Sequence, residues 1–537
     1  MTTAMNNTFI NALLADASYV GYDSDWLRNL KDRLTQPLAN FITANFEVVN
    51  QENATDGGFG ATVWVGKSTG DYAGQVYVSM RGTQEFPIDG IDDAQLAATG
   101  ITYNQIKNMV NWWLRETTPA GQMATQIDYI SVQPNPEAPD SYDFIAAPSV
   151  LITANNGGHL SNVTAIDFVN GHSLGGYLAT AFERIFGNVS NIETFNSAGF
   201  NRLQTQNIND AFIQIAAAIN APLIRTGFAN NLQTNYFGEN GVEVTTNAWD
   251  PVGFNQIGQR VALYQEDAAP TLIDNHYMYK ITDLLALGDA ISKLDTNFNI
   301  SQLNDFVSKS SYRMEASYEK LLDGLRQTIL GGTVTDTLTG DTSNTALGSS
   351  RVDYHNNLKA LTDSVYFQAL IGKVTLVAPP SSASEARSDF SAFLSLFYLT
   401  PFALKTNNAE ANNLLLAIHT ALGDKWTDDY NLSDEAIDAG AANFSDMWLA
   451  DRVAMLSWKN LINKEDFVAT NALGYSSSGA ASQIFEDPNT RIVINGSIGN
   501  EHYIKFGENI DADTLSGGSK ADHLYGMGGN DTINGGN

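Results

Sequence analysis

The chain of 537 residues contains no cysteine, which excludes disulfide bonds and thiolate chemistry. It also has no run of eighteen apolar residues: the nearest stretch, residues 390–404, is interrupted by Ser395 and Pro401, so no membrane span is predicted. The first residues lack the charged and then apolar layout of a secretory signal. Basic residues are scarce, with 29 Lys and Arg against 59 Asp and Glu and a net charge of −30. This balance argues against a nucleic acid partner and against long-range attraction to anionic membranes.

The strongest chemical signal is the pentapeptide at residues 171–175, which reads Gly-His-Ser-Leu-Gly. It follows an apolar segment, residues 163–170, that predicts a buried strand, and it precedes residues 176–186, which predict a helix. In this strand–turn–helix context the G-x-S-x-G pattern is typical of a nucleophile elbow. The turn would hold Ser173 in a strained conformation at a helix N-terminus, which favours developing negative charge. Ser173 is therefore the predicted nucleophile.

A serine nucleophile needs a base, and the base needs an orienting carboxylate. In the chain order typical of this architecture, the acid and then the histidine follow the serine. Five of the seven histidines follow Ser173, and His276 is the preferred base because it lies in a loop just before an apolar segment. Asp250, after the strand-like residues 242–246, is the preferred acid. Asp274 is its rival, although its closeness to His276 along the chain gives it poor reach to the ring.

An oxyanion hole needs two hydrogen-bond donors. One is expected to be the backbone N–H of Leu174, the residue after the nucleophile. The other is expected in the turn Arg-Gly-Thr at residues 81–83, which follows the predicted strand at residues 75–80. Thr83 could donate its backbone N–H there and steady the anion with its hydroxyl.

These pieces together resemble a class 3-type lipase of the α/β-hydrolase superfamily. The matching stretches are Met-Arg-Gly-Thr at 80–83, Gly-His-Ser-Leu-Gly-Gly at 171–176, Asp-Pro-Val at 250–252, and the late His276. The resemblance implies an α/β-hydrolase fold over about residues 1–290, with Ser173, Asp250 and His276 as a triad and with Thr83 and Leu174 as oxyanion donors. It implies ester hydrolysis but does not specify the substrate.

The C-terminus carries a repeat. Residues 517–525 and 526–534 both fit G-G-x-G-x-D-x-U-x, except that Lys520 and Met527 each replace a glycine. A weaker copy precedes them, so that three aspartates, each two residues before an aliphatic residue, recur with a period of nine: Asp513, Asp522 and Asp531. This pattern resembles the calcium-binding nonapeptide of RTX proteins. Calcium, a hard cation, is expected as a structural cofactor bound by turn carbonyls and Asp carboxylates.

Two nonapeptides complete one coil of a parallel β-roll, so calcium is shared between motifs eighteen residues apart. Asp513 and Asp531 could therefore share one ion, whereas Asp522 would pair with a position near 540. About one complete calcium site and an incomplete last repeat are expected. The RTX resemblance further implies a bacterial protein that is secreted to the cell exterior by the type I secretion machinery.

The expected fold class is α/β, with an α/β-hydrolase domain at 1–290, a mainly helical region at 291–465, a strand-rich connector at 466–510 and a truncated β-roll at 511–537. The adjacent Trp112 and Trp113 are not expected to face one core. The predicted function is a secreted serine ester hydrolase that cleaves a lipid or phospholipid at an interface, as a lipase or a phospholipase A. A non-lipid carboxylesterase, or an RTX adhesin or toxin module whose hydrolase domain serves binding, stay open as alternatives.

Overall fold

The structure, a computed structural model, describes residues 3–53, 58–82, 102–135, 138–151, 157–201, 205–221, 227–239, 254–265, 276–310, 316–332, 334–337, 349–469, 483–490, 492–494 and 502–536. The chain divides into two compact units. Unit 1 comprises Met1–Gln265, Ala269–Ala286 and Asn344–Val352, and unit 2 comprises Glu266–Ala268, Leu287–Ser343 and Asp353–Asn537. The chain is mixed α/β, as the sequence predicts, with a largely parallel sheet in unit 1 and short C-terminal strands in unit 2.

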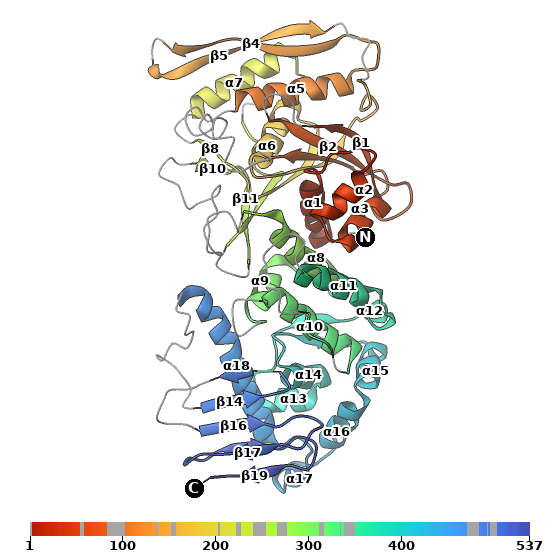
Figure 1. The fold of residues 1–537 in the computed structure, drawn as a ribbon, viewed down its shortest axis with the longest axis vertical. Helices are drawn as coiled ribbons and strands as arrows, with labels where there is room; N and C mark the ends of the chain where they lie inside the picture. Colours follow the sequence, from red (N-terminus) through yellow and green to blue (C-terminus); the bar gives the residue numbers. More distant parts are fainter. Residues whose placement is uncertain are drawn as a thin grey trace. The chain divides into compact units, whose positions relative to one another are not determined.

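A seven-stranded sheet of order β1-β2-β3-β6-β7-β9-β11 forms the centre of unit 1 (Figure 1). Its first three strands are antiparallel, and every pairing from β3 to β11 is parallel. The carboxyl ends of the mutually parallel strands from β3 to β11 therefore lie at one edge of the sheet, where ligand sites of open α/β sheets form. The strands are β1 (Phe46–Glu52), β2 (Gly60–Gly66), β3 (Val76–Arg81), β6 (Ile166–His172), β7 (Val189–Phe195), β9 (Gln233–Gly238) and β11 (Gln259–Leu263).

Helices α1 (Ala4–Ala17) and α6 (Leu174–Phe186) pack on β3, β6 and β7 from opposite faces. Alternation along β7 shows this, because successive side chains of a strand point to opposite faces. Thr194 lies against Gly176 of α6, whereas its neighbour Glu193 is hydrogen-bonded by side chains of α1. Within the described residues, the remaining helices that lie wholly in unit 1 are α2 (Trp26–Arg33), α3 (Gln36–Asn45), α5 (Tyr103–Thr117) and α7 (Thr205–Ala218).

Both tryptophans of α5 are buried, which corrects the expectation that they could not share a core. Trp112 lies against Phe59, and Trp113 meets Phe182 of α6 edge-on at 4.8 Å between ring centroids. One hydrophobic cluster contains all four rings, because two neighbouring indoles reach two walls of the same core. Beyond α5 and α7, β4 (Ala124–Asn135) and β5 (Ala138–Leu151) form a long antiparallel hairpin, and β8 (Phe200–Asn201) pairs with β10 (Phe254–Asn255) (Figure 1).

Unit 2 begins as a set of helices with a small antiparallel pair, β12 (Thr375–Val377) and β13 (Ala403–Lys405). Helix α8 (Met278–Leu294) runs from unit 1 into unit 2, and α11 (Ser349–Asp363) begins in unit 1. The other helices are α9 (Ile300–Ser308), α10 (Ser317–Leu330), α12 (Val365–Leu370), α13 (Ala383–Ser388), α14 (Phe390–Tyr398), α15 (Ala409–Ile418), α16 (Thr420–Tyr430), α17 (Asp434–Asp438) and α18 (Asp446–Ala469).

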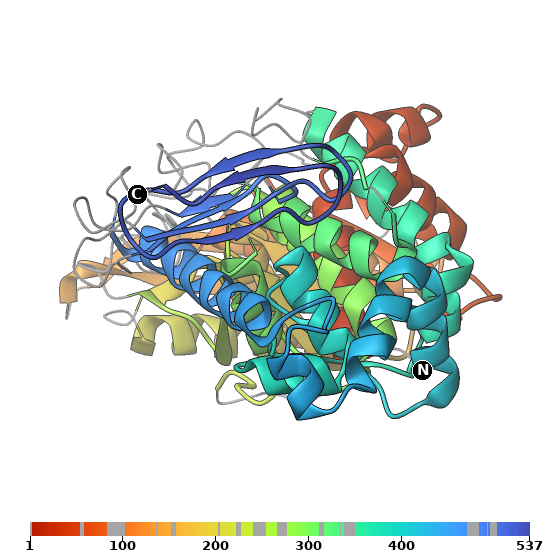
Figure 2. The same cartoon turned by 90° about the horizontal axis from the view of Figure 1, so that it is seen from below.

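Short strands at the C-terminal end of unit 2 form two facing sheets, seen from below in Figure 2. One sheet has the order β15-β14-β16-β18, in which β14, β16 and β18 are parallel, and the other pairs β17 with β19 in parallel. The chain alternates between the sheets from β16 onward, as a parallel roll requires. The strands are β14 (Gln483–Asp487), β15 (Ile492–Ile494), β16 (His502–Phe506), β17 (Thr514–Ser516), β18 (His523–Tyr525) and β19 (Thr532–Asn534).

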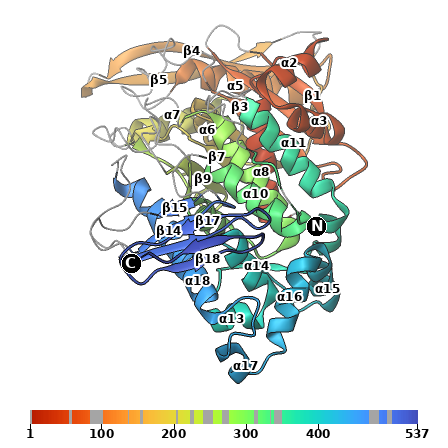
Figure 3. The ribbon, with the colours of Figure 1, turned by 60° about the horizontal axis from the view of Figure 1, so that its bottom comes forward.

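Helix α18 packs beside the larger sheet of the roll (Figure 3). Trp448 meets Phe506 of β16 edge-on, and Phe506 stacks on Tyr525 of β18 at 5.1 Å between centroids. The carboxylate of Asp451 accepts hydrogen bonds from Nδ1 of His523 and from the hydroxyl of Tyr525, both at 2.6 Å. The roll therefore shares aromatic packing and polar contacts with the helical part of unit 2.

Candidate functional site

Ser173 lies between the end of β6 and the start of α6 with φ 58° and ψ −130°. A non-glycine residue pays a steric cost in this region, and such strained residues concentrate at functional sites. Backbone hydrogen bonds hold the turn: the N–H of Ser173 donates to the carbonyl of Phe195, and its own carbonyl accepts from Gly176 and Ala198. The strained conformation that the sequence predicts for Ser173 is therefore present at the carboxyl edge of the sheet.

Close backbone packing explains the glycines that flank Ser173. A Cβ atom on Gly171 would lie 2.3 Å from the carbonyl oxygen of Gly175, and a Cβ on Gly175 would lie 2.2 Å from the carbonyl oxygen of Met80. Both obstacles are backbone atoms, which cannot rotate away as a side chain can. The elbow therefore needs glycine at both positions to bring α6 this close to the end of β3.

Of the two expected oxyanion donors, only Leu174 lies within the described residues. Leu174 is the first residue of α6, so its backbone N–H has no acceptor within the helix. Thr83 lies outside the described residues, as does Asp250, the predicted acid. Gly82, just before Thr83, is close to the elbow, since a Cβ on it would come within 3.0 Å of the Ser173 Cβ. The N–H of Gly82 is engaged, however, because it donates to the Tyr19 hydroxyl at 3.1 Å.

The structure brings His276 to the elbow. The rings of His276 and His172, the residue before Ser173, are 4.7 Å apart between centroids. The backbone carbonyl of buried His276 accepts hydrogen bonds from His172 Nε2 at 2.7 Å and from Asn196 Nδ2 at 3.3 Å. Helix α8 begins two residues later, at Met278. Ser173, Leu174, Gly82 and His276 thus meet at one edge of the sheet.

Two residues of this site escaped the sequence analysis. Asn196 follows β7 with φ 42°, and its Oδ1 accepts from the N–H of Gly238 at the end of β9. It could have been found as a polar residue directly past a strand end. Tyr19 comes from the segment after α1, 153 residues before His172, and its hydroxyl lies 2.9 Å from His172 Nδ1. Nothing local in the sequence points to this contact.

Burial determines the protonation states of His172 and Tyr19. Burial, with a smaller contribution from neighbouring His276, lowers the pKa of His172 well below its usual value. Burial also raises the pKa of Tyr19 to about 12, against the opposing effect of Arg33, whose guanidinium lies 4.3 Å above the Tyr19 ring. Both side chains are therefore neutral at neutral pH. His172 is also excluded as a base for Ser173, because both of its ring nitrogens are already hydrogen-bonded.

The C-terminal aspartates line the turns of the roll. Thr514 of β17 pairs with Thr532 of β19, and this register aligns Asp513 with Asp531. The N–H of Asp513 donates to Asp531 Oδ1 at 3.0 Å, and Asp513 Oδ2 accepts from the N–H of Glu508 at 2.6 Å. Asp522 lies at the opposite edge of the roll, where it accepts from the N–H groups of Tyr503 and Gly518.

Backbone carbonyls crowd the same turns. A Cβ on Gly528 would lie 2.3 Å from the carbonyl oxygen of Asn509, and one on Gly529 would lie 2.1 Å from that of Asp511. Carbonyl and carboxylate oxygens from turns about one coil apart are the donors that calcium prefers, so these residues fit the ion. Among the described residues no three His, Asp or Glu side chains cluster as a metal site.

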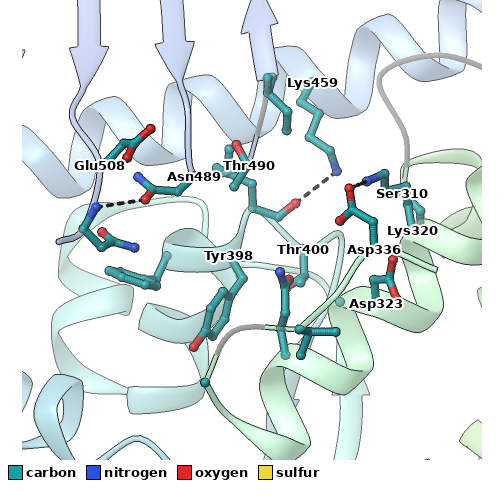
Figure 4. A pocket seen from close by; sticks show the side chains of 18 of the residues that line it. Ser310, Lys320, Asp323, Asp336, Tyr398, Thr400, Lys459, Asn489, Thr490 and Glu508 are labelled. Carbon is teal, nitrogen blue, oxygen red and sulfur yellow. Dashed lines mark hydrogen bonds and ion pairs between the residues drawn. The ribbon is translucent and has the colours of Figure 1, made fainter. Parts of the chain in front are cut away.

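Unit 2 also contains a pocket of about 330 Å³ (Figure 4). Lys459 of α18 reaches its wall, where its ammonium donates to the carbonyls of Lys309 and Leu399, both at 3.0 Å. Burial lowers the pKa of Lys459 to about 7. Another wall carries Lys320 and Asp336, whose charged ends are 3.7 Å apart. Because its ammonium already donates to these two backbone carbonyls, Lys459 links the C-terminal ends of α9 and α14.

Comparison with known proteins identifies the C-terminal segment. The family described as RTX calcium-binding nonapeptide repeat (4 copies) matches residues 509–537. No curated protein matches the chain. The match supports calcium as a structural cofactor of this segment, and such repeats are typical of proteins exported by type I secretion. Within the described part of the chain, no helix combines the length and apolar character needed to cross a membrane.

Proposed function

We propose that the chain is a secreted serine hydrolase of lipid carboxylic esters, a lipase or phospholipase A, whose unit 1 is an α/β-hydrolase domain. The observation that carries the proposal is the backbone of Ser173: a non-glycine residue at φ 58° between a parallel strand and a helix, with His276 at the same sheet edge. Strain of this kind projects a serine oxygen from a strand–helix turn. Its cost of about 1–3 kcal/mol is reasonable where the conformation serves chemistry.

In the proposed reaction His276 takes the hydroxyl proton of Ser173, and the serine oxygen attacks the ester carbonyl carbon. The negative charge that develops on the carbonyl oxygen is held by the N–H of Leu174 and by Thr83. His276 then gives the proton to the leaving alcohol, and an acyl-enzyme remains. Water attacks this acyl-enzyme while His276 takes a proton from the water. His276 returns that proton to Ser173 as the fatty acid leaves. Asp250 orients the His276 ring and stabilises its cation.

The surroundings of Gly82 support the assignment of Thr83. A backbone N–H can serve an oxyanion only if no protein group already accepts it, and the N–H of Gly82 is bound to Tyr19. The next N–H along the turn belongs to Thr83. Leu174 suits the second position, because a helix N-terminus presents free N–H groups and a favourable dipole to an anion.

Calcium has a separate role in this proposal. Bound at the roll, the ion supplies positive charge that neutralises turn carboxylates and stabilises the folded repeat. Asp513, Asp531 and the carbonyls of the facing turns are the proposed ligands of one ion. Asp522 belongs to the opposite edge, where its carboxylate fixes the turn through two backbone N–H groups.

The test measures fatty acid release from micellar phosphatidylcholine and from emulsified triacylglycerol, with calcium and with chelator. Ser173→Ala should reduce the rate by about 10⁴-fold or more, because the covalent step loses its nucleophile. Ser18→Ala is the matched control: it removes another buried hydroxyl of unit 1, one that only bonds the carbonyl of Ala15. Its activity should match that of the wild type.

The lipid that is hydrolysed faster identifies the substrate class. Activity that survives Ser173→Ala would contradict the proposed nucleophile. A folded, calcium-loaded protein that cleaves only soluble short-chain esters would overturn the lipid assignment in favour of a non-lipid esterase. Absence of any esterase activity would favour a binding module.

A further inference from the structure

A chain of hydrogen bonds crosses the candidate site next to Ser173. It starts at the N–H of Gly82, passes through the hydroxyl of Tyr19 and the ring of His172, and ends at the backbone carbonyl of His276. Its three links measure 3.1, 2.9 and 2.7 Å. These hydrogen bonds thus join Gly82, which precedes Thr83, to the elbow and to the proposed base.

The direction of every link follows from its ends. A backbone N–H can only donate, so the Tyr19 oxygen accepts from Gly82, and a carbonyl can only accept, so His172 Nε2 carries a proton toward His276. Because His172 is neutral, its Nδ1 is then an acceptor for the Tyr19 O–H. All four groups are satisfied in one arrangement only, with Nε2–H as the tautomer of His172.

The links join three segments of unit 1 that are far apart in the sequence. Gly82 follows β3, His172 ends β6, and His276 precedes α8, so each comes from a different part of unit 1. Gly82 is also in close contact with the elbow, since a Cβ placed on it would lie 2.7 Å from the carbonyl oxygen of His172. Asn196 adds a second donor to the His276 carbonyl from the end of β7.

We propose that Tyr19 and His172 are positioning residues for the proposed hydrolysis. Their hydrogen bonds fix the distance between the oxyanion turn and the backbone of the base, with Ser173 between them. This inference rests on the proposed function. Neither residue exchanges a proton with the substrate: Tyr19 and His172 act only by holding Gly82 and His276 in place. A shift of about 1 Å in such a constellation lowers a rate by about 100-fold.

Tyr19→Phe is the most direct test, because it removes one hydroxyl and keeps the ring under Arg33. We expect kcat on the preferred ester to fall by about 10- to 100-fold with KM within about 2-fold, since Tyr19 is proposed to act through Gly82 and His172 and not by binding the substrate. Labelling of Ser173 by a small fluorophosphonate should slow by a similar factor. That reagent needs the nucleophile and the oxyanion donors but no lipid-binding surface.

Tyr72→Phe is the matched control. Tyr72 is a buried tyrosine of unit 1, and its hydroxyl bonds the side-chain amide of Asn6, away from Ser173. If Tyr19→Phe and Tyr72→Phe lower the melting temperature equally and leave the same kcat, Tyr19 has only a structural role and the inference is refuted. A selective loss of kcat in Tyr19→Phe supports it.

A second readout does not depend on hydrolysis. ¹⁵N NMR of histidine-labelled protein should show one neutral histidine in the Nε2–H form whose Nδ1 signal shifts in Tyr19→Phe and not in Tyr72→Phe. A protein that lacks Ser173-dependent activity but shows this signal would overturn the proposed function and leave the hydrogen-bonded chain intact. An active enzyme in which the tautomer is Nδ1–H would overturn the inference alone.

Discussion

Replacing Arg452 by alanine should strongly destabilise unit 2. This arginine of α18 is buried, and its Nη1 lies 2.6 Å from Oδ2 of buried Asp487 at the end of β14. Its other two nitrogens donate to the carbonyls of Leu396 and Phe397 at the end of α14. Arg452→Ala would leave a buried carboxylate without its cation, which costs about 3–5 kcal/mol. For a unit of this size the melting temperature should fall by about 6–20 °C.

The assay is thermal and urea unfolding of the full chain, with calcium and with chelator. The loss should be large with calcium and small without it, because Arg452 is enclosed only while the roll is folded against α18. Lys359→Ala is the control: Lys359 forms an exposed ion pair with Asp363 on α11, and its loss should cost less than about 1 kcal/mol. Arg452→Met combined with Asp487→Asn should recover much of the stability, since no unpaired charge remains.

Two results would refute this reasoning. One is a loss below about 1 kcal/mol in calcium, which would mean that Asp487 is not enclosed as the structure places it. The other is an equal loss with and without calcium, which would mean that the roll contributes nothing to the burial of Arg452.

Three further predictions concern the two units. Gly175→Ala should lower the stability of unit 1 by about 1–3 kcal/mol in thermal unfolding, because its Cβ would meet the Met80 carbonyl at 2.2 Å, whereas Gly227→Ala, with nothing within 4 Å, should be nearly neutral. Burial raises the pKa of Glu193 from 4.5 to about 8, so between these pH values its carboxyl group holds a proton in the folded state that it has lost in the unfolded state. Unit 1 should therefore lose stability as the pH rises from 4.5 to 8. In urea unfolding across this range, Glu193→Gln should reduce the dependence of stability on pH. A concentration of calcium 100-fold above Kd should stabilise unit 2 by about 2.7 kcal/mol, and Asp531→Asn should reduce that gain while Asp438→Asn, on an exposed residue of α17, should leave it unchanged.

The local part of the candidate site could be predicted from the sequence. A glycine two residues on either side of Ser173, a strand before and a helix after are signals within about twenty residues, and they reflect local sterics. The roll could also be predicted, because its nine-residue period repeats along the chain. Its departures have a visible consequence: Met527, which replaces a glycine of the repeat, adopts φ 65°, a conformation that glycine reaches without steric cost.

The contacts between distant segments could not be predicted in this way. Tyr19 reaches His172 only because α1 crosses β6, and no pattern near residue 19 encodes that crossing. For Trp112 and Trp113 a prediction was made and was wrong. Helical neighbours point about 100° apart, which suggested two environments, but both indoles belong to one hydrophobic cluster with residues of β2 and α6.

The scarcity of cations in this chain makes their burial in α18 informative. With 29 basic and 59 acidic residues, a lysine or arginine removed from the surface leaves the surplus of negative charge less screened. Yet Arg452 and Lys459, both on α18, are buried against the C-terminal carbonyls of α14. Helix C-termini leave carbonyls unsatisfied, so the N–H groups of two basic side chains on one helix can satisfy the last carbonyls of α14 without solvent. Arg452 also pairs with Asp487 at the end of β14, so it links the C-terminal strands to the helices of unit 2. Calcium that folds the roll should therefore stabilise these helices as well.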